Sequence, residues 1–438
     1  MKKVTSILIG AGLRGGYVYS QYALDHPDEF KVVAVAEPDQ ERRKLFAAKH
    51  NIPKELQYES YEELLQQDKM ADCAMICTQD KMHYEPVTMA MQKGYHVLCE
   101  KPMSPDKEEI IKMGAMAKKY DRILSVCHVL RYSPFFSKIK EILEEGRIGR
   151  MMSIQHIEEV GYWHHAHSFV RGNWRNKEES SPMILQKCCH DMDLYLWLAD
   201  KKCKSLSSFG STYLFKEENA PEGCTKRCLD GCKVKATCPY DAESIYLDSE
   251  RIGARNGNTR WPLDVVTEIP TPESVEEALK TGPYGRCVYH CDNDVVDHQV
   301  VNLNMTDGST MSFSMNGHTA DFARHAQFCG TKGEMNVTMG SWDVEDDFIE
   351  TTLFGAKLKT ELIPASELSD DFSGHGGGDI VMVEEFVDIL LGNREESPSI
   401  TSLEKSVESH YCALAAEESR LHGGAVIELD DIRQKGSM

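Results

Sequence analysis

The sequence predicts an α/β protein whose N-terminal part is a doubly wound parallel sheet. Short apolar runs alternate with helix-like segments over the first 130 residues, and a glycine-rich turn directly follows the first run. Later runs instead alternate apolar and polar residues, as antiparallel strands with one covered face do. These runs are residues 295–303, 310–316, 324–329 and 334–338. We therefore expect two domains, residues 1–130 and 131–438.

The N-terminal elements follow one another in a strand–helix rhythm. We expect strands at residues 4–9, 30–36, 71–77, 95–99 and 123–128. Helices are expected up to about residue 24 and at 40–50, 61–67, 83–93 and 106–119. Crossovers of this length join parallel strands with a right-handed turn and place helices on both faces of the sheet.

The overall composition excludes several classes of protein. Lys and Arg total 49 against 70 Asp and Glu, a net charge of −21, which argues against binding to nucleic acid or to an anionic membrane surface. Apolar runs all stay short of the roughly 18 residues of a membrane helix, and glycines and Arg14 interrupt the first one. The 15 cysteines are odd in number and cannot all pair within one chain, so we expect a reducing, cytoplasmic location.

The glycine-rich turn predicts a dinucleotide site because it lies between a strand and a helix. Gly10 permits the tight turn, Gly12 lets the backbone approach a pyrophosphate, and Gly15 allows close helix–strand packing. The backbone N–H groups at the helix start, including those of Leu13 and Arg14, then face the phosphates.

Glu37 ends the second expected strand and bears on the choice of nucleotide. A carboxylate there accepts both ribose hydroxyls of NAD and repels the 2′-phosphate of NADP. Arg42 and Arg43 lie just behind it and weaken this preference. We expect NAD rather than NADP; the alternative is an ordinary solvated loop acid.

Lys101 is the first catalytic candidate. It stands in Cys99-Glu100-Lys101-Pro102, just after the strand at 95–99, and residues past the carboxyl ends of parallel strands face the ligand. A lysine held there donates a hydrogen bond to a hydroxyl or carbonyl oxygen while hydride moves. The alternative for Lys101 is a solvated surface side chain.

The string Gly94-Tyr95-His96-Val97-Leu98-Cys99-Glu100-Lys101-Pro102, together with Ile9-Gly10-Ala11-Gly12, Thr78 and His83, resembles the Gfo/Idh/MocA oxidoreductase family. The resemblance covers residues 1–150 closely, with Arg131-Tyr132-Ser133-Pro134 included, and the rest more loosely. It implies NAD(P)-dependent hydride transfer to or from a hydroxyl of a sugar, cyclitol or glycoside. It also implies a C-terminal α/β domain on a large open antiparallel sheet, whose open face pairs subunits into a homo-oligomer. For single residues it implies cofactor contacts by Thr78, His83 and Glu100 and substrate contacts by Arg131 and Tyr132.

The resemblance extends to a second catalytic segment. Asn173-Trp174-Arg175 resembles the family's Trp-Arg pair, with Arg175 on the cofactor side of the cleft and Trp174 at the substrate or in plain packing. A helix is expected at residues 182–198. The family pattern Asp-x-Gly-x-His-x-x-Asp matches at its last two positions, His190 and Asp193, but has Gln186 and Cys188 at the first two.

The change from Asp to Gln186 alters the expected chemistry. Gln186 and His190 are i,i+4 neighbours on a helix, and Lys187 and His190 are i,i+3 neighbours, so these side chains can share a face. A Gln amide positions a substrate but takes no proton. The general base is then His190 or Lys101, or Lys187 if burial and neighbouring cations lower its pKa.

Two polar segments give further candidates. His375 lies in a glycine-rich stretch, residues 374–379, before an expected helix at 380–391, and resembles the His-Gly-Gly-x-Asp segment of NAD-dependent glycosidases. The alternative is a helix-entry loop with a passive histidine. A segment with His164, His165, His167 and Arg171 is either a polar sugar pocket or a solvated loop.

These candidates leave two enzymatic hypotheses. The first is a dehydrogenase acting on a carbohydrate hydroxyl. The second is a redox-neutral glycosidase that oxidises C3 transiently and eliminates the anomeric group, which His375 and Gln186 favour. A non-catalytic NAD sensor is disfavoured because Lys101 and His190 are both present.

A cysteine-rich insertion is expected at about residues 203–295. Its four closely spaced cysteines could wrap a structural zinc ion, although their spacing is not that of the paired Cys-x2-Cys sites. They are Cys224, Cys228, Cys232 and Cys238. Cys287 and Cys291 are alternative ligands, and reduced loop thiols or labile disulfides are the alternative to a metal.

Overall fold

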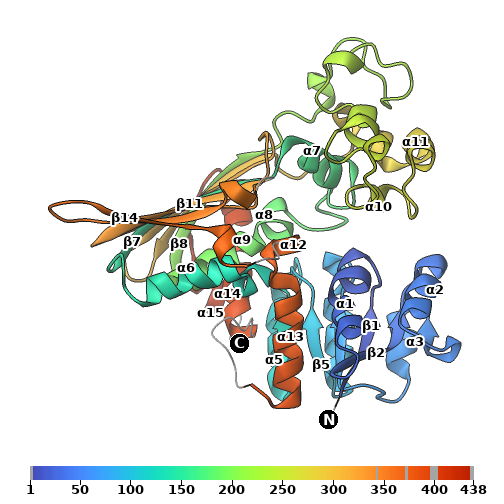
Figure 1. The fold of residues 1–438 in the computed structure, drawn as a ribbon, viewed down its shortest axis with the longest axis horizontal. Helices are drawn as coiled ribbons and strands as arrows, with labels where there is room; N and C mark the ends of the chain where they lie inside the picture. Colours follow the sequence, from blue (N-terminus) through green and yellow to red (C-terminus); the bar gives the residue numbers. More distant parts are fainter. Residues whose placement is uncertain (1–2, 342–343, 370–372, 395–402, 435–438) are drawn as a thin grey trace.

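The computed structural model describes residues 3–341, 344–369, 373–394 and 403–434, in two sheets with helices around them (Figure 1). Sheet A is parallel, in the order β3-β2-β1-β4-β5-β6. Its strands are β1 (Val4–Ile9), β2 (Phe30–Ala36), β3 (Gln57–Tyr58), β4 (Cys73–Ile76), β5 (His96–Cys99) and β6 (Leu124–Val126). The predicted doubly wound sheet is confirmed. Its order reverses between β1 and β4, which places a ligand crevice at the carboxyl ends of these strands.

In the part of the chain that the structure describes, five helices cross over sheet A, and three of them begin at a side-chain cap. They are α1 (Gln21–Asp25), α2 (Gln40–Lys49), α3 (Tyr61–Gln66), α4 (Tyr84–Gln92) and α5 (Lys107–Tyr120). Asp39 accepts the Arg42 N–H at 2.8 Å at the start of α2, and Asp106 accepts two N–H groups at the start of α5. The glycine-rich turn leads into a π-helical segment, Leu13–Tyr19, before α1.

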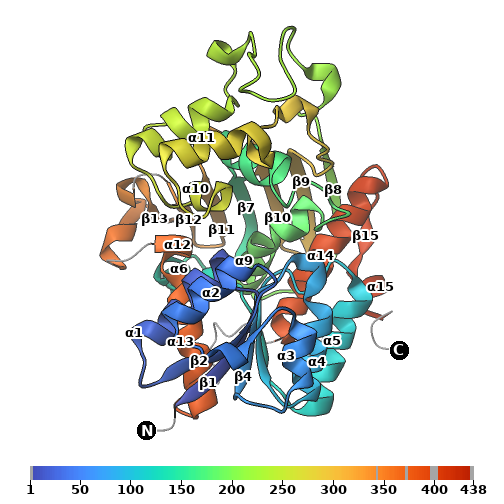
Figure 2. The same cartoon turned by 90° about the vertical axis from the view of Figure 1, so that its right-hand side faces the viewer.

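A helix from the far end of the chain completes one face of sheet A. This helix, α13 (Gly378–Leu391), lies against the sheet (Figures 1 and 2). Its Met382, Val383, Phe386 and Val387 share a core with side chains of β1 and β2. The expected boundary at residue 130 therefore assigns α13 to the second domain, although its side chains pack in the core of the first.

Sheet B has the order β14-β13-β12-β11-β7-β10-β9-β8-β15. Its strands are β7 (Met151–Glu159), β8 (Cys203–Ser211), β9 (His298–Met305), β10 (Thr310–Asn316), β11 (Ala323–Gly330), β12 (Gly333–Met339), β13 (Phe348–Leu353), β14 (Lys359–Pro364) and β15 (Ile427–Glu428). Neighbouring strands are antiparallel except for β7 and β10, which are parallel. The sheet is therefore mixed rather than wholly antiparallel, because β7 and the hairpin strand β10 enter it from the same end.

Helices cover one face of sheet B and leave the other open. The covering helices include α6 (Pro134–Glu144), α9 (Cys189–Ala199), α14 (Leu403–Leu421) and α15 (Leu429–Gln434). Alternate residues of β9 and β10 are buried beneath them, as period-2 patterning requires. Among the described residues, no helix has both the length and the apolar character needed to cross a bilayer.

The connection from β8 to β9 forms a separate lobe. Residues 203–211, which we expected inside the insertion, form β8, so the insertion covers residues 212–297. It contains α10 (Leu263–Val266) and α11 (Pro272–Thr281) and packs on α7 (Tyr162–His165) through two small apolar cores (Figure 1).

The helix expected at residues 182–198 is interrupted. It consists of α8 (Met183–Gln186) and α9, separated by Lys187 and Cys188. The Gln186 carbonyl accepts the Lys101 ammonium at 2.8 Å, and the Cys188 N–H donates back to Met183 at 3.4 Å. The Lys101 ammonium thus binds the Gln186 carbonyl, which in a continuous helix would accept from a backbone N–H one turn further on.

Candidate functional site

The glycine-rich turn has the shape of a pyrophosphate cradle. Gly10 has φ +89°, and a Cβ there would lie 2.5 Å from the Cys77 carbonyl oxygen. A Cβ on Gly15 would lie 2.4 Å from the Gly10 carbonyl oxygen, whereas one on Gly12 would meet nothing within 4 Å. Gly10 and Gly15 are thus required by packing, and Gly12 leaves open space beside the helix start, where Leu13 and Arg14 present backbone N–H groups.

Glu37 lies next to this turn. Its carboxylate accepts the Ala11 N–H at 2.8 Å and the Asp39 N–H at 3.0 Å, and Arg42 approaches it at 3.3 Å. The side chain is buried, with 4% of its surface exposed. The end of β2 therefore holds a carboxylate beside the glycine loop, the arrangement that recognises a ribose diol.

The side chain of Arg14 is engaged by protein carboxylates. Its guanidinium donates to Glu100 at 3.0 Å and to Asp379 at 3.2 Å, and Tyr19 donates to Glu100 at 2.6 Å. Burial alone would raise the pKa of Glu100, but Arg14, Lys101 and the Tyr19 hydrogen bond hold it below its usual value. Glu100 and the Arg14 guanidinium therefore join the glycine loop to β5 and α13, and Arg14 is left to meet a cofactor through its backbone N–H.

Thr78 and His83 organise the turn after β4. The Thr78 hydroxyl donates to the Met82 carbonyl at 3.0 Å. The ring nitrogens of His83 lie 2.7 Å from the Pro102 carbonyl oxygen and 3.1 Å from that of Thr78. His83 is 1% exposed and braces the Lys101-Pro102 segment, whose peptide bond is cis, and the cofactor contact that the resemblance implied for it stays a prediction.

Lys101 reaches from β5 to the interrupted helix of the second half. Its ammonium donates to the Gln186 carbonyl at 2.8 Å, and its backbone N–H donates to Glu100 at 2.8 Å. The Gln186 amide itself is committed elsewhere, accepting from Ser180 at 2.6 Å and donating to the Trp174 carbonyl at 2.9 Å. Gln186 thus positions Lys101 through its backbone carbonyl. We expected its side-chain amide to position a substrate, but both ends of that amide are bound to protein groups.

His190 lies at the start of α9, four residues after Gln186, whose carbonyl accepts from Lys101. It is 4% exposed, and its Nδ1 has no hydrogen-bond partner among the described residues. Burial and the charges of Lys101, His375 and His128 lower its pKa well below the usual value. The imidazole is therefore neutral at neutral pH and able to accept a proton.

Lys187 is not free to act as a base. Its ammonium lies 2.8 Å from Glu158, which also pairs with Arg324 at 3.1 Å. Arg324 in turn contacts Asp191 at 2.9 Å. Lys187 thus belongs to a buried ion network that links α9 to sheet B. It has a carboxylate partner where we required cationic neighbours, so this geometry does not favour its catalytic role, which stays a prediction.

Arg131 and Tyr132 are buried beneath the site. The Arg131 guanidinium donates to Asp193 at 2.6 Å, and both residues are at most 2% exposed. Tyr132 is 4% exposed and packs in the core shared with α13. The side chains of these two residues support α9 and the sheet from behind, and their expected substrate contacts stay predictions that this geometry does not favour.

Arg175 also differs from the expectation. It pairs with Asp292 at 2.8 Å and with Glu179 at 2.8 Å, and so clamps the insertion rather than a nucleotide. Trp174 is 36% exposed and lies 6.4 Å from the Phe169 ring, so one side packs and the other is accessible to a ligand.

His375 joins the site from α12 (Ser373–Gly376). Its ring centroid lies 5.1 Å from that of His190, and its Nδ1 lies 3.2 Å from Asp379. Burial lowers the pKa of His375, while Asp379 opposes that shift. Because Asp379 is also held by Arg14, the geometry is that of an oriented His–Asp pair next to a second imidazole.

One buried group of the site escaped sequence reasoning. His128 follows β6, is 1% exposed, and lies 3.7 Å from Asp193 and 6.4 Å, ring to ring, from His190. Burial, followed by His410 and Arg131, lowers its pKa well below the usual value. His128 closely follows the last parallel strand, as Lys101 follows β5. This position after a strand end could have identified it from the sequence.

The histidine-rich segment before Trp174 is helical and buried. It forms α7 and a π-helical turn, Ala166–Arg171, and His165, His167 and Arg171 are at most 2% exposed. His167 stacks on Tyr284 of the insertion at 4.6 Å. Neither the solvated loop nor the open sugar pocket describes it, because the insertion covers this segment.

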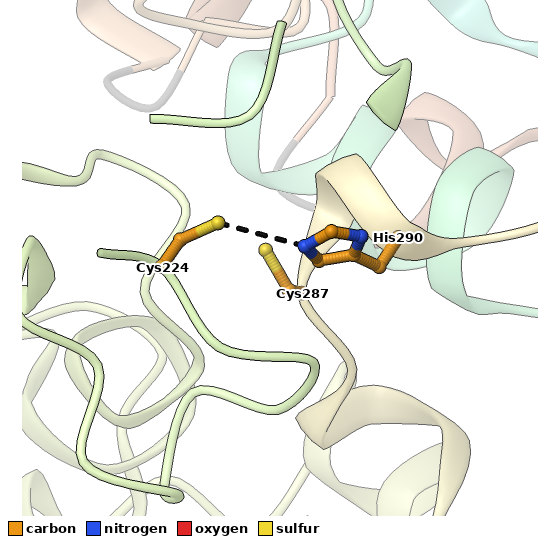
Figure 3. Close-up of side chains that lie close together, drawn as sticks. All are labelled: Cys224, Cys287 and His290. Atoms are coloured by element: carbon orange, nitrogen blue, oxygen red, sulfur yellow. Dashed lines mark hydrogen bonds between the residues drawn. The ribbon is translucent and has the colours of Figure 1, made fainter. Parts of the chain in front are cut away.

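The cysteines predicted to bind zinc meet other partners. All four line one small cavity with Cys287, but only Cys224 among them lies within 4.8 Å of a group of potential ligand atoms, those of Cys287 and His290 (Figure 3). All fifteen cysteines are free thiols.

Comparison with known proteins agrees with this geometry. Residues 4–128 match the oxidoreductase family with an NAD-binding Rossmann fold, and residues 136–228 match the Gfo/Idh/MocA C-terminal domain. The Bacillus subtilis protein YteT, named as an oxidoreductase, is 24% identical over 378 residues, which are 83% of this chain and 82% of YteT. Mouse trans-1,2-dihydrobenzene-1,2-diol dehydrogenase is 36% identical over 146 residues, but this match covers 32% of the chain and 43% of that enzyme.

Solved structures show the same fold. An Agrobacterium radiobacter oxidoreductase in complex with NAD+, L-tartaric acid and magnesium has a TM-score of 0.66 at 15% identity, covering 98% of this chain and 100% of that one. Aldose–aldose oxidoreductase of Caulobacter crescentus, with glycerol, has a TM-score of 0.64 at 14% identity and the same coverage.

The glycine cradle, the strand order and the matched N-terminal domain define an NAD-binding oxidoreductase. Because residues 4–128 match the family's N-terminal domain and residues 136–228 match its C-terminal domain, in that order, the protein belongs to the Gfo/Idh/MocA oxidoreductase family.

Proposed function

We propose that the protein is an NAD-dependent dehydrogenase that oxidises or forms a hydroxyl of a sugar, cyclitol or glycoside. The observation that carries the proposal is that Lys101, at the carboxyl edge of sheet A, donates to the Gln186 carbonyl four residues before a neutral, buried His190. The sugar-acting enzymes among the structural neighbours agree with this substrate class.

The residues divide the reaction between them. Gly12 and the first N–H groups of the following helix hold the pyrophosphate, and Glu37 accepts from the adenosine ribose. NAD, when bound, supplies the hydride acceptor. His190 removes the hydroxyl proton, and Lys101 donates a hydrogen bond to the same oxygen and stabilises its developing negative charge. In the reverse direction the protonated His190 returns the proton to the new hydroxyl.

A redox-neutral glycosidase is the second candidate, and the contact between His375 and His190 favours it. Elimination and water addition after oxidation need a second acid–base group, and the His375–Asp379 pair lies 5.1 Å, ring to ring, from His190.

One assay separates the two candidates. Purified protein is incubated with aryl glycosides, free sugars and cyclitols while NADH absorbance and aglycone release are recorded together. A dehydrogenase gives NADH in proportion to substrate and no aglycone. Aglycone release with catalytic NAD and no net NADH would replace it with the glycosidase, and neither signal with any substrate of these classes would contradict the proposal.

We further propose that the open face of sheet B pairs two copies of the chain. Ile157 of β7 and Val300 of β9 are 43% and 40% exposed there, on either side of Ser314. Two exposed apolar side chains so close together on a sheet face that no helix covers support an interaction surface there. The cytoplasmic location expected from the cysteine content remains a prediction.

A further inference from the structure

The insertion holds a group of side chains that the proposed dehydrogenase chemistry does not use. Cys224 Sγ, Cys287 Sγ and a ring nitrogen of His290 all lie within 4.8 Å of one another, and Cys224 Sγ is 3.5 Å from His290 Nε2. Figure 3 shows the three side chains converging on one point from two different segments of the insertion.

These distances match the edges of a zinc tetrahedron. Zinc binds thiolate at about 2.3 Å and imidazole at about 2.0 Å, so a tetrahedral site has sulfur–nitrogen edges of about 3.5 Å and sulfur–sulfur edges of about 3.8 Å. The observed sulfur–nitrogen distance of 3.5 Å equals such an edge.

Backbone pairing places Cys228 on the same face as Cys287, beside the group of three ligand atoms. Arg227 and Arg286 form an antiparallel bridge, flanked by hydrogen bonds from the Cys228 N–H to Gly285 at 3.0 Å and from the Cys287 N–H to Lys226 at 2.9 Å. Cys228 and Cys287 each follow a bridge residue. Because side chains alternate along paired strands, both point to the face opposite the two arginines.

A buried positive charge favours thiolates at this position. Arg171 is 1% exposed, and in the described part of the chain no carboxylate forms an ion pair with it. Its guanidinium donates to the Tyr240 carbonyl at 2.6 Å and to Cys228 Sγ at 3.7 Å. A buried charge without a counter-ion is costly. Three thiolates and one neutral imidazole around Zn²⁺ carry a net charge of −1, which offsets that of Arg171.

The other nitrogen of His290 has the partner that a ligand histidine needs. His290 Nδ1 lies 3.4 Å from a carboxylate oxygen of Glu217. Such a carboxylate favours the proton on Nδ1 and leaves Nε2, which faces Cys224, to bind a metal.

A small cavity adjoins these groups. Cys224, Cys228 and Cys287 are among its lining residues, together with Cys232 and Cys238 but without His290, and its volume is about 10 Å³, room for one atom of water size.

We propose that Cys224, Cys228, Cys287 and His290 bind one structural Zn²⁺ that joins the two ends of the insertion. Three thiols release their protons on binding, and the ion undergoes no redox change. This ligand set retains Cys224 and Cys228 from the sequence-based prediction and replaces Cys232 and Cys238 with residues about sixty positions further on.

The first test is metal analysis of the untagged, full-length protein after growth with zinc and iron both supplied. We expect about one zinc per chain by mass spectrometry and, by X-ray absorption, three sulfur ligands near about 2.3 Å and one nitrogen near about 2.0 Å. Zinc far below one per chain, iron in its place, or a site of four sulfurs would overturn the proposal. This measurement uses the wild-type protein and does not depend on any variant folding.

Variants then test the ligand set. Cys224→Ser, Cys228→Ser and His290→Ala are expected to reduce bound zinc severalfold, whereas Cys232→Ser, Cys238→Ser and Cys291→Ser retain it. Cys291 is the matched control, since it lies in the same turn and its thiol donates to the Cys287 carbonyl at 3.3 Å. Loss of zinc from Cys232→Ser or Cys238→Ser, with retention in Cys228→Ser, would contradict this assignment.

Discussion

Lys101 is held at the end of β5 by a neutral backbone carbonyl. In the described residues its ammonium makes one hydrogen bond, to Gln186, which leaves further N–H donors for a ligand oxygen. Glu100, next in the chain, is occupied by Arg14 and Tyr19. A lysine fixed in this way keeps its charge directed at the site without being neutralised by a carboxylate.

We expect Lys101→Ala to lower kcat by about 10²–10⁴-fold, because the developing alkoxide loses its donor. NAD affinity, measured by fluorescence titration, is expected to change little, since the glycine loop is untouched. Lys93→Ala is the control, a lysine of the same domain whose ammonium donates to the Gln67 carbonyl at 2.7 Å at the surface. Turnover of Lys101→Ala near the wild-type rate would exclude Lys101 from catalysis.

His190 determines the expected pH dependence of oxidation. Its base form is the neutral imidazole, and burial with nearby cations lowers its pKa well below the usual value. As pH falls, the group therefore stays active past the range in which an ordinary histidine becomes protonated, about 6.5. We predict that kcat/KM for oxidation loses activity on the acid side only below this range, measured in buffers of constant ionic strength with stability checked at each pH.

His190→Asn is expected to remove that acid limb together with most of the activity. If the acid limb of the kcat/KM profile is centred at or above the usual pKa of histidine, or if it persists unchanged in His190→Asn, another group is the base. His375→Asn serves as the comparison, because the dehydrogenase needs only His190 whereas the glycosidase needs both.

At the scale of elements, the interrupted α8–α9 segment is held from below by ion pairs. Asp193 accepts from Arg131 at 2.6 Å, and Asp191 contacts Arg324 at 2.9 Å. Burial raises the pKa of Asp193, with Arg131 opposing the shift. The pair therefore fixes the orientation of α9 more than it adds stability, because desolvation offsets much of its attraction.

Breaking this pair on one side leaves a buried charge unpaired. We expect Arg131→Met to lower the free energy of unfolding by about 3–5 kcal/mol, measured by urea denaturation. The double variant Arg131→Met/Asp193→Leu is expected to regain most of that loss, since both charges are then gone. Equal stability of the single variant and the wild type would mean that the pair is not buried in solution.

The elements also mark the limits of sequence reasoning. The parallel strands and their helices were predictable, since apolar runs and caps are local features. The break at Lys187 and Cys188 was not, because it depends on Lys101, 85 residues away in the chain. The same is true of α13, whose apolar residues could have faced either sheet.

At the scale of the whole molecule, sheet B presents a broad face that the helices do not cover. A hollow of about 740 Å³ lies on it, lined by residues of β7, β9, β10, β11 and β12. Ile157 and Val300 lie at this surface, and burying them is favourable by the area they remove from water.

We predict that Ile157→Arg/Val300→Arg converts an oligomer to monomers, because two charges would then be buried where two apolar side chains had been. Mass is measured by light scattering after gel filtration over a range of protein concentrations. The control is Leu45→Arg, a residue of α2 that is 56% exposed and far from sheet B. A wild-type protein that is monomeric throughout, or a variant that retains the wild-type mass, would contradict the pairing of these faces.

The sequence by itself determined the nucleotide half of the molecule and the catalytic candidates Lys101 and His190, because glycine spacing, strand ends and helix periodicity are written in neighbouring residues. Tertiary structure alone decided what the other polar residues do. Arg131, Arg175, Lys187 and Gln186 have the chemistry to bind a substrate, but the fold supplies each with a protein partner. Whether a buried polar group is hydrogen-bonded to protein or free to bind a ligand depends on contacts between segments that are distant in the chain. Patterns among neighbouring residues do not predict those contacts.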